Sequence, residues 1–256
     1  MSKREERMKH MLKVIEQYNN IPLRDLASIE NVSPLTIRRD IEEMEKLGYV
    51  QNIRGEVFFR GTNGNADEYL LSIATSRHAK EKKAIGECAA KMINPDDFVI
   101  IDNGTTTEQL SASIPYNIRA TFLCYNLNVV NNLYRKPNIS LIFCGGYFHE
   151  QTLMFECPES LDIIRRSRAN KVFVSAAGIH EKLGVTCVSE YELANKREII
   201  KAGAERILLL DSSKFGIIKP CFVGEIEVFD TIITDSGVSD EWASLIQDKG
   251  VNLIIA

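Results

Sequence analysis

The segment Asp102–Thr107 combines residue types that bind phosphate groups. It reads Asp-Asn-Gly-Thr-Thr-Thr, follows the apolar run 98–101 directly and precedes a helical pattern. Glycine lets the backbone approach a ligand, the threonines supply hydroxyls, and the first turn of a helix offers free N–H groups with a partial positive charge. We interpret the segment as a phosphate-binding loop, although an ordinary strand-to-helix turn is the alternative; its members are Asp102, Asn103, Gly104, Thr105, Thr106 and Thr107. Because it matches neither GxGxxG nor a Walker loop, no dinucleotide or ATP cofactor is expected.

Three further strand ends carry residues that could complete this site. Gly145 and Gly146 follow one apolar run, Gly178 follows a second, and Asp211 and Lys214 follow a third. Glycines permit close approach of a ligand, lysine offers a cation to a phosphate, and aspartate could accept a hydrogen bond from a sugar hydroxyl. Simple turns and a surface lysine are the alternatives. The nearby pair Lys196-Arg197 is expected to be solvated.

A second set of candidates lies on a helix predicted over 34–46. At about 100° per residue, Ile37, Ile41, Met44 and Leu47 form its buried side. The opposite side and the N-terminal cap carry residues that could contact DNA: Ser33, Leu35, Thr36, Arg38 and Arg39. Arginine can bond guanine in a bidentate way, and Leu35 and Thr36 can touch a thymine methyl. The alternative is a solvated helix face.

The elements around this helix form a helix-turn-helix pattern. A helix is predicted over 5–18, and a short helix follows with Pro22 at its first position. A three-residue turn then leads to the helix over 34–46. Strand-like runs at 49–53 and 56–59, joined by Arg54-Gly55, predict a hairpin that forms a wing. Arg54 is therefore a further candidate for DNA contact.

Charge and composition divide the chain of 256 residues, whose formal net charge is −4. Residues 1–60 hold 11 Lys and Arg against 10 Asp and Glu, whereas residues 61–256 hold 20 against 25. The stretch 61–67 lacks apolar periodicity and is rich in turn formers. We therefore expect a DNA-binding domain over 1–60, a linker over 61–77 and a ligand-sensing domain over 78–256.

The large domain is predicted to be α/β. Helical patterns alternate with apolar runs, which predicts a mostly parallel sheet covered on both faces. The strands are expected at 98–101, 119–124, 139–143, 172–176, 206–210, 229–233 and 252–255. Ligands of such sheets bind beyond the carboxyl ends of the strands, where the candidate residues lie.

Several classes of protein are not expected from this composition. No apolar run approaches the roughly 20 residues of a membrane span, and the basic start Met1–Arg4 is followed by Glu5 and Glu6, which a secretory signal would not have. The six cysteines form no CxxC pair, so we expect reduced thiols in a cytoplasmic protein. The four histidines are scattered, and no metal site is expected.

Several motifs resemble those of the DeoR family of bacterial repressors. In the first sixty residues they are Leu26-Ala27, Val32-Ser33, Thr36-Ile37-Arg38-Arg39-Asp40 and Leu47-Gly48-Tyr49-Val50. The family's effector domain is similar to a sugar-phosphate isomerase of the ribose 5-phosphate type. Its motifs correspond here to Asp102–Thr106, Gly145-Gly146, Gly178 and the stretch 211–216. Segments 124–128, 143–149 and 175–180 resemble one branch of the family and imply deoxyribose 5-phosphate as the effector.

The sequence thus predicts a regulator that binds double-stranded operator DNA and a phosphorylated sugar. Reading two DNA half-sites requires a homodimer or a higher oligomer. An aldose–ketose isomerase needs a carboxylate base, and the strand end 175–178 has none, so a sensor without turnover is expected. Two alternatives remain: an active isomerase fused to a DNA-binding head, and a sugar-phosphate-binding protein whose winged module contacts protein.

Overall fold

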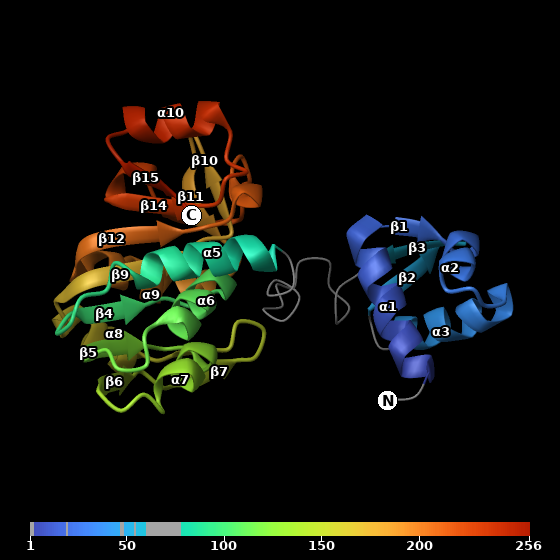
Figure 1. The fold of residues 1–256 in the computed structure, drawn as a ribbon, viewed down its shortest axis with the longest axis horizontal. Helices are drawn as coiled ribbons and strands as arrows, with labels where there is room; N and C mark the ends of the chain where they lie inside the picture. The colour runs from blue at the N-terminus through green and yellow to red at the C-terminus, as the bar shows by residue number, and fades with distance from the viewer. Residues whose placement is uncertain (1–2, 19, 47–48, 54, 60–77) are drawn as a thin grey trace. The chain divides into compact units, whose positions relative to one another are not determined.

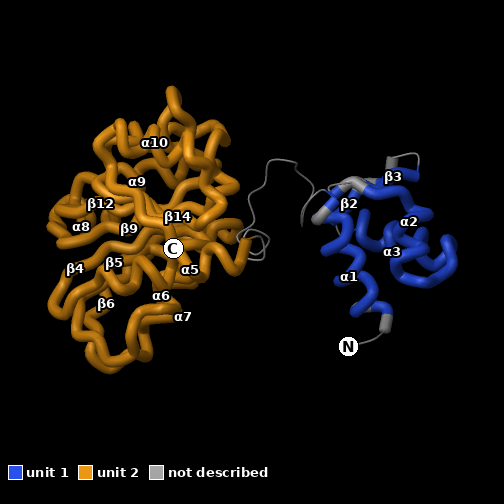
Figure 2. The backbone as a smooth tube through the Cα atoms, turned by 45° about the horizontal axis from the view of Figure 1, so that its top comes forward, with its two compact units in different colours: residues 1–70 blue, residues 71–256 orange. Residues whose placement is uncertain are grey.

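The computed structural model describes residues 3–18, 20–46, 49–53, 55–59 and 78–256. They belong to two compact units, residues 1–70 and residues 71–256, shown in two colours in Figure 2. We call them the head and the sensor unit. The expected linker over 61–77, the DNA-contact candidate Arg54 and the expected core residue Leu47 lie outside the described residues.

The head contains the predicted three helices and the wing. The helices are α1 (Lys3–Tyr18), α2 (Leu23–Ile29) and α3 (Pro34–Lys46), and the wing strands are β2 (Val50–Ile53) and β3 (Glu56–Phe59). A further strand, β1 (Asn20–Pro22), pairs with β3 and completes an antiparallel sheet of order β1-β3-β2. The prediction that Pro22 is the first helical residue is therefore wrong. Its ψ of 139° is extended, and it ends β1 just before α2.

One apolar core holds the head together. The predicted side of α3 is buried, with Ile37 and Ile41 fully inside beside Met11 and Ile15 of α1. Val57 brings the wing into the same core. The apolar core thus holds α3 by the side opposite its exposed candidates for DNA contact.

The sensor unit is built on seven parallel strands, in the order β15-β14-β12-β9-β4-β5-β6 (Figure 1). All seven predicted apolar runs form these strands, some with shifted ends. They are β4 (Phe98–Ile101), β5 (Ala120–Cys124), β6 (Ile139–Phe143), β9 (Ala169–Ser175), β12 (Gly203–Leu209), β14 (Thr231–Thr234) and β15 (Asn252–Ile255).

Helices cover both faces of the large sheet, as a doubly covered parallel sheet requires. Alternate residues of β4 show the two layers: Val99 and Ile101 pack with one core, and Ile100 packs with the other. The first core includes residues of α5 (Ala79–Ala90), α6 (Thr105–Ser113) and α7 (Leu127–Leu133). The second includes residues of α8 (Pro158–Arg166), α9 (Glu190–Ala202) and α10 (Asp240–Asp248).

Two small antiparallel sheets and two 3₁₀ turns complete the sensor unit. One sheet joins β7 (Tyr147–His149) to β8 (Met154–Glu156). The other has the order β10-β11-β13, with bounds Gly178–His180, Gly184–Cys187 and Cys221–Gly224. The turns are Ser212–Lys214 and Ile226–Val228. Within the described residues, no helix has the length and apolar character needed to cross a membrane.

Candidate functional site

The exposed face of α3 presents two arginines that make no hydrogen bond or ion pair with described residues. Arg38, Arg39 and Leu35 are exposed, as predicted, and Leu35 leaves 60% of its surface open although it is apolar. Ser33 and Thr36 have a local role. The Ser33 hydroxyl accepts the Thr36 N–H at 3.2 Å and lies 2.8 Å from the Thr36 hydroxyl, an N-cap for α3.

Asp40 is a residue of the head that sequence reasoning missed. It lies on the buried side of α3, and its carboxylate accepts bonds of 2.8 Å from both Arg4 and Arg7 of α1. Arg4 also pairs with Glu43. These bonds neutralise Asp40 and Glu43 within the head. Arg38 and Arg39 are the exposed charges one turn after Leu35, and the exposed Glu42 follows a further turn along α3.

In the sensor unit, Gly104 turns the chain from β4 into α6. Its φ of 151° lies in a region that favours glycine, and a Cβ atom there would stand 2.5 Å from the Ser175 Oγ of β9. The first helical bond runs from the Glu108 N–H to the Gly104 carbonyl, so the three preceding N–H groups have no intrahelical acceptor. No side chain caps this end of α6. Thr105, Thr106 and Thr107 are buried around it, and the Thr107 hydroxyl donates to the Gly104 carbonyl.

Asp102 lies beneath this loop, with its carboxylate bonded entirely to the protein. One oxygen accepts the Tyr125 hydroxyl; the other accepts the Ser175 N–H at 2.9 Å and the Lys196 ammonium at 2.6 Å. Burial raises the pKa of Asp102, and these donors oppose that rise. Because both oxygens accept bonds from buried protein groups and the side chain is fully buried, the carboxylate holds the loop in place from beneath.

The expectation that Lys196 is solvated is wrong. It leaves only 1% of its surface exposed, and its ammonium also donates to the Ser175 carbonyl at 3.0 Å. Glu192, one turn earlier on α9, lies 3.6 Å away and accepts a bond of 3.0 Å from the Asn103 amide. Burial alone would lower the pKa of Lys196, but the carboxylates of Asp102 and Glu192 raise it above its usual value. Arg197 is exposed, as expected.

The glycine candidates differ in whether the surrounding chain leaves room for a side chain. A Cβ on Gly146, whose φ is 137°, would stand 2.2 Å from the Glu156 carbonyl, and one on Gly178 would stand 2.4 Å from the Ile217 carbonyl. Both are therefore required by the packing of the chain itself. Gly145 has open space at that point, and its carbonyl accepts the Ser160 hydroxyl at 2.6 Å.

Asp211 and Lys214 follow β12, which neighbours β9 in the sheet. One carboxylate oxygen of the buried Asp211 accepts from Ser213, while the other has no hydrogen-bond partner among the described residues. Lys214 is half-buried, and its ammonium group bonds no described residue. Parallel pairing places the ends of β12, β9, β4, β5 and β6 at one edge, which we call the carboxyl edge. The candidates are thus gathered there, while no described contact joins Lys214 to the loop.

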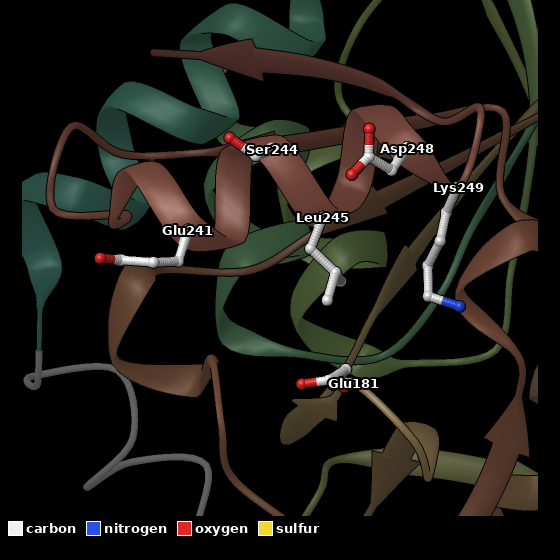
Figure 3. A pocket seen from close by; sticks show the side chains of 6 residues that line it. All are labelled: Glu181, Glu241, Ser244, Leu245, Asp248 and Lys249. Carbon is white, nitrogen blue, oxygen red and sulfur yellow. The ribbon is translucent and has the colours of Figure 1, made fainter.

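A separate hollow lies against α10 and is unsuited to phosphate. Figure 3 shows Glu181 facing α10 across it. Its only cationic lining residue, Lys249, bonds Glu227. Carboxylates dominate the lining, and they repel an anionic ligand. The lining residues are Glu181, Glu241, Ser244, Leu245, Asp248 and Lys249. In the part of the chain that the structure describes, no group of three or more His, Cys, Asp or Glu residues could hold a metal ion.

Two family models match the chain along the two units. A DeoR-like helix-turn-helix domain matches residues 7–59, and a DeoR C-terminal sensor domain matches residues 77–236. The deoxyribose operon repressor of Escherichia coli K12 is 31% identical over 99% of both chains. The transcriptional regulator GolR of Listeria innocua is 28% identical over 98% of both. A ribose 5-phosphate isomerase A from Methanocaldococcus jannaschii overlaps 52% of this chain and 53% of its own, at 13% identity and a TM-score of 0.38. The two domain matches and the full-length identity show that the chain belongs to the DeoR family of helix-turn-helix transcriptional repressors.

Proposed function

We propose that a phosphorylated sugar binds at the carboxyl edge of the sensor unit and releases the repressor from its operator. The uncapped N-terminus of α6 carries this proposal. Three backbone N–H groups without intrahelical acceptors, a glycine turn and three threonines form the arrangement that binds a phosphate dianion. The carboxylates of Asp102 and Glu192 offset the charge of Lys196 beneath the loop, so the N–H groups of α6 would supply the main attraction for the phosphate.

The head would bind operator DNA through the N-terminal half of α3. Arg38 and Arg39 are the candidates for base readout, because neither is engaged by a described acid and both are exposed. Leu35 supplies an apolar contact for a thymine methyl. Ser33 and Thr36 would contribute mainly by capping the helix that carries these side chains.

Deoxyribose 5-phosphate is the effector we propose first. The support is the full-length identity to a relative named a deoxyribose operon repressor, together with the phosphate-binding geometry of the loop. A ligand shifts the equilibrium between DNA-binding and released states only by its difference in affinity for them. The active form would be a homodimer or higher oligomer in the cytoplasm, where two heads can reach two half-sites.

We further propose that the sensor unit binds without turnover. Proton transfer between two sugar carbons needs a carboxylate with a free lone pair near the substrate. Asp102 and Glu192, the buried carboxylates beside the loop, are bonded to neighbouring protein groups. Asp211 keeps one carboxylate oxygen without a partner among the described residues, but no described contact joins it to the loop, and the strand end 175–178 carries no Asp or Glu. Conversion of ribose 5-phosphate or deoxyribose 5-phosphate by the purified protein would contradict this proposal.

Thermal unfolding of the full chain against sugar phosphates and the matching free sugars tests the proposed ligand. A ligand at 100 times its dissociation constant stabilises by about 2.7 kcal/mol. We expect a shift with deoxyribose 5-phosphate and none with deoxyribose. A shift of the unfolding temperature with another sugar phosphate would identify that compound as the effector and still support the proposed site. No shift with any of the compounds would overturn the proposed sensor function.

A further inference from the structure

Several segments that bond the phosphate loop or its neighbours carry buried polar atoms without partners. Five side chains there leave at most 7% of their surface exposed, yet each has one polar atom without a hydrogen bond in the described structure. The atoms are the Oδ1 of Asn103, Asn126 and Asn195, the Nδ2 of Asn128, and the Oγ1 of Thr152. A buried polar group without a partner destabilises the fold, so such a group usually has a water or a ligand as its partner.

These side chains come from separate elements that meet at the carboxyl edge. Asn103 follows β4, and Asn126 follows β5 and bridges to Met154 of β8. Asn195 of α9 donates to the Phe155 carbonyl of β8. Thr152 precedes Leu153, whose carbonyl accepts the Leu127 N–H. The hairpin β7–β8, α9 and the phosphate loop are therefore held together around this group of side chains.

The bonds of the amides fix which of their atoms is free. Asn103 faces the Glu192 carboxylate, and Asn126 and Asn195 face backbone carbonyls; these partners can only accept, so each amide turns its NH₂ toward them. The free atom of all three is consequently an acceptor. Asn128 accepts from Asn126, which leaves its NH₂ as a free donor.

This pattern selects the chemistry of the ligand. Three acceptors, one donor and one hydroxyl match groups that both donate and accept, which hydroxyls do and a phosphate dianion does not. We propose that Asn103, Asn126, Asn128, Thr152 and Asn195 form a subsite for the hydroxyl groups of the sugar, next to the phosphate loop. The inference rests on the proposed function, because it assigns the other half of the same ligand.

Thr152→Val provides the sharpest test, because valine keeps the shape of the side chain and removes only the hydroxyl. Without ligand, the full-length variant should melt at or above the wild-type temperature, since the hydroxyl has no partner to lose. Its affinity for the sugar phosphate that binds wild type should fall about tenfold. Asn195→Leu should weaken the same ligand by ten- to a hundredfold. Binding of inorganic phosphate, measured by calorimetry, should be unchanged in both variants.

Ser111→Ala and Asn132→Leu are matched controls on α6 and α7. Their polar groups are bonded to each other and to the Glu108 carbonyl, so these variants should melt earlier and bind the ligand as wild type does. If one of the sugar phosphates tested binds wild type and both subsite variants with equal affinity, the unpartnered atoms hold water only and the subsite is refuted. A loss of melting temperature in Thr152→Val equal to that of Ser111→Ala would also refute it. If none of the sugar phosphates tested binds wild type, the proposed function fails, and the subsite fails with it.

Discussion

The head and the sensor unit use charge in opposite ways. In the head, Arg38 and Arg39 are exposed without a described partner, and the helix beneath them is held by an ordinary apolar core. In the sensor unit, Lys196 and Asp102 are fully buried and bonded to each other at the proposed site. The exposed arginines of α3 can be replaced without loss of fold, whereas the buried pair of Lys196 and Asp102 cannot.

The largest expected effect follows from breaking the buried pair of the sensor unit. Lys196→Met leaves the Asp102 carboxylate buried without its cation and should destabilise the sensor unit by about 3–5 kcal/mol. Calorimetric unfolding measures the change. Lys201→Met, which removes an exposed pair with Glu198, should cost less than about 1 kcal/mol and is the matched control. Equal effects in the two variants would show that burial of the Lys196 pair adds nothing to the stability of the sensor unit.

In the head, loss of an exposed arginine should lower DNA binding and leave stability unchanged. Arg39→Ala should reduce specific operator binding by about 1–3 kcal/mol and leave the unfolding temperature unchanged, because Arg39 bonds no described group. Titration of labelled operator DNA at fixed salt measures the loss. Arg135→Ala, an exposed arginine of the sensor unit, is the control and should bind DNA as wild type does. A lower unfolding temperature in Arg39→Ala would show a structural role instead.

Asp40 is the point at which the head resembles the sensor unit. Asp40→Asn removes the charge that Arg4 and Arg7 share and should destabilise the head by about 1–2 kcal/mol, less than Lys196→Met because both arginines reach solvent. Denaturation monitored at low and high salt measures the change. The loss should shrink at high salt, since exposed charges are screened. A loss of unfolding free energy as large as that of Lys196→Met would show that the partly exposed ion pairs of the head are as important for stability as the buried pair of the sensor unit.

The smallest expected effect is the loss of stability that each buried thiol causes in the sensor unit at alkaline pH. Burial raises the pKa of the Cys124 and Cys187 thiols to about 12 and that of Cys144 to about 11. A thiol whose folded pKa is raised stabilises the fold below its unfolded pKa, and this stability is lost as pH rises through that value toward the folded one. Each thiol should therefore cost about 1 kcal/mol at pH 9.5 relative to pH 7.5.

The head contains no cysteine, so only the unfolding transition of the sensor unit should move in this way. Cys124→Ala should reduce the pH dependence of that transition. An unchanged slope in this variant would show that another group, such as the buried Tyr125, causes the alkaline loss.

Much of the fold could be predicted because its strands are long apolar runs. Each of the seven parallel strands contains a run of apolar residues that sets it apart from its flanking helices in the sequence, as Phe98–Ile101 shows. The strands β1, β7 and β10 have three residues each, too few to show an alternation. They form because neighbouring chain segments supply their partners, which is information of tertiary structure.

The candidate site was predictable at its glycine and threonine positions and not at its buried charges. The segment 102–107 contains its own chemistry, so a reader of the sequence can find it. Lys196 acquires its role from Asp102, which lies 94 residues earlier in the chain. The available signal was local: Glu192, Lys196 and Ile199 repeat at helical spacing, which places both charges on the apolar side of α9. An ionisable residue on a buried face indicates a distant partner, and the same reasoning would have found Asp40.

The bond from the Ser175 N–H to Asp102 has a consequence for hydrogen exchange. Amides at strand ends commonly exchange with solvent first, because the ends fray. Ser175 ends β9, yet its N–H is buried and donates to a carboxylate that Lys196 and Tyr125 also hold. Its proton should therefore exchange only when the whole sensor unit opens, as slowly as those in the middle of the sheet. Slow exchange at Ser175 would place this part of the carboxyl edge among the most protected backbone of the sensor unit.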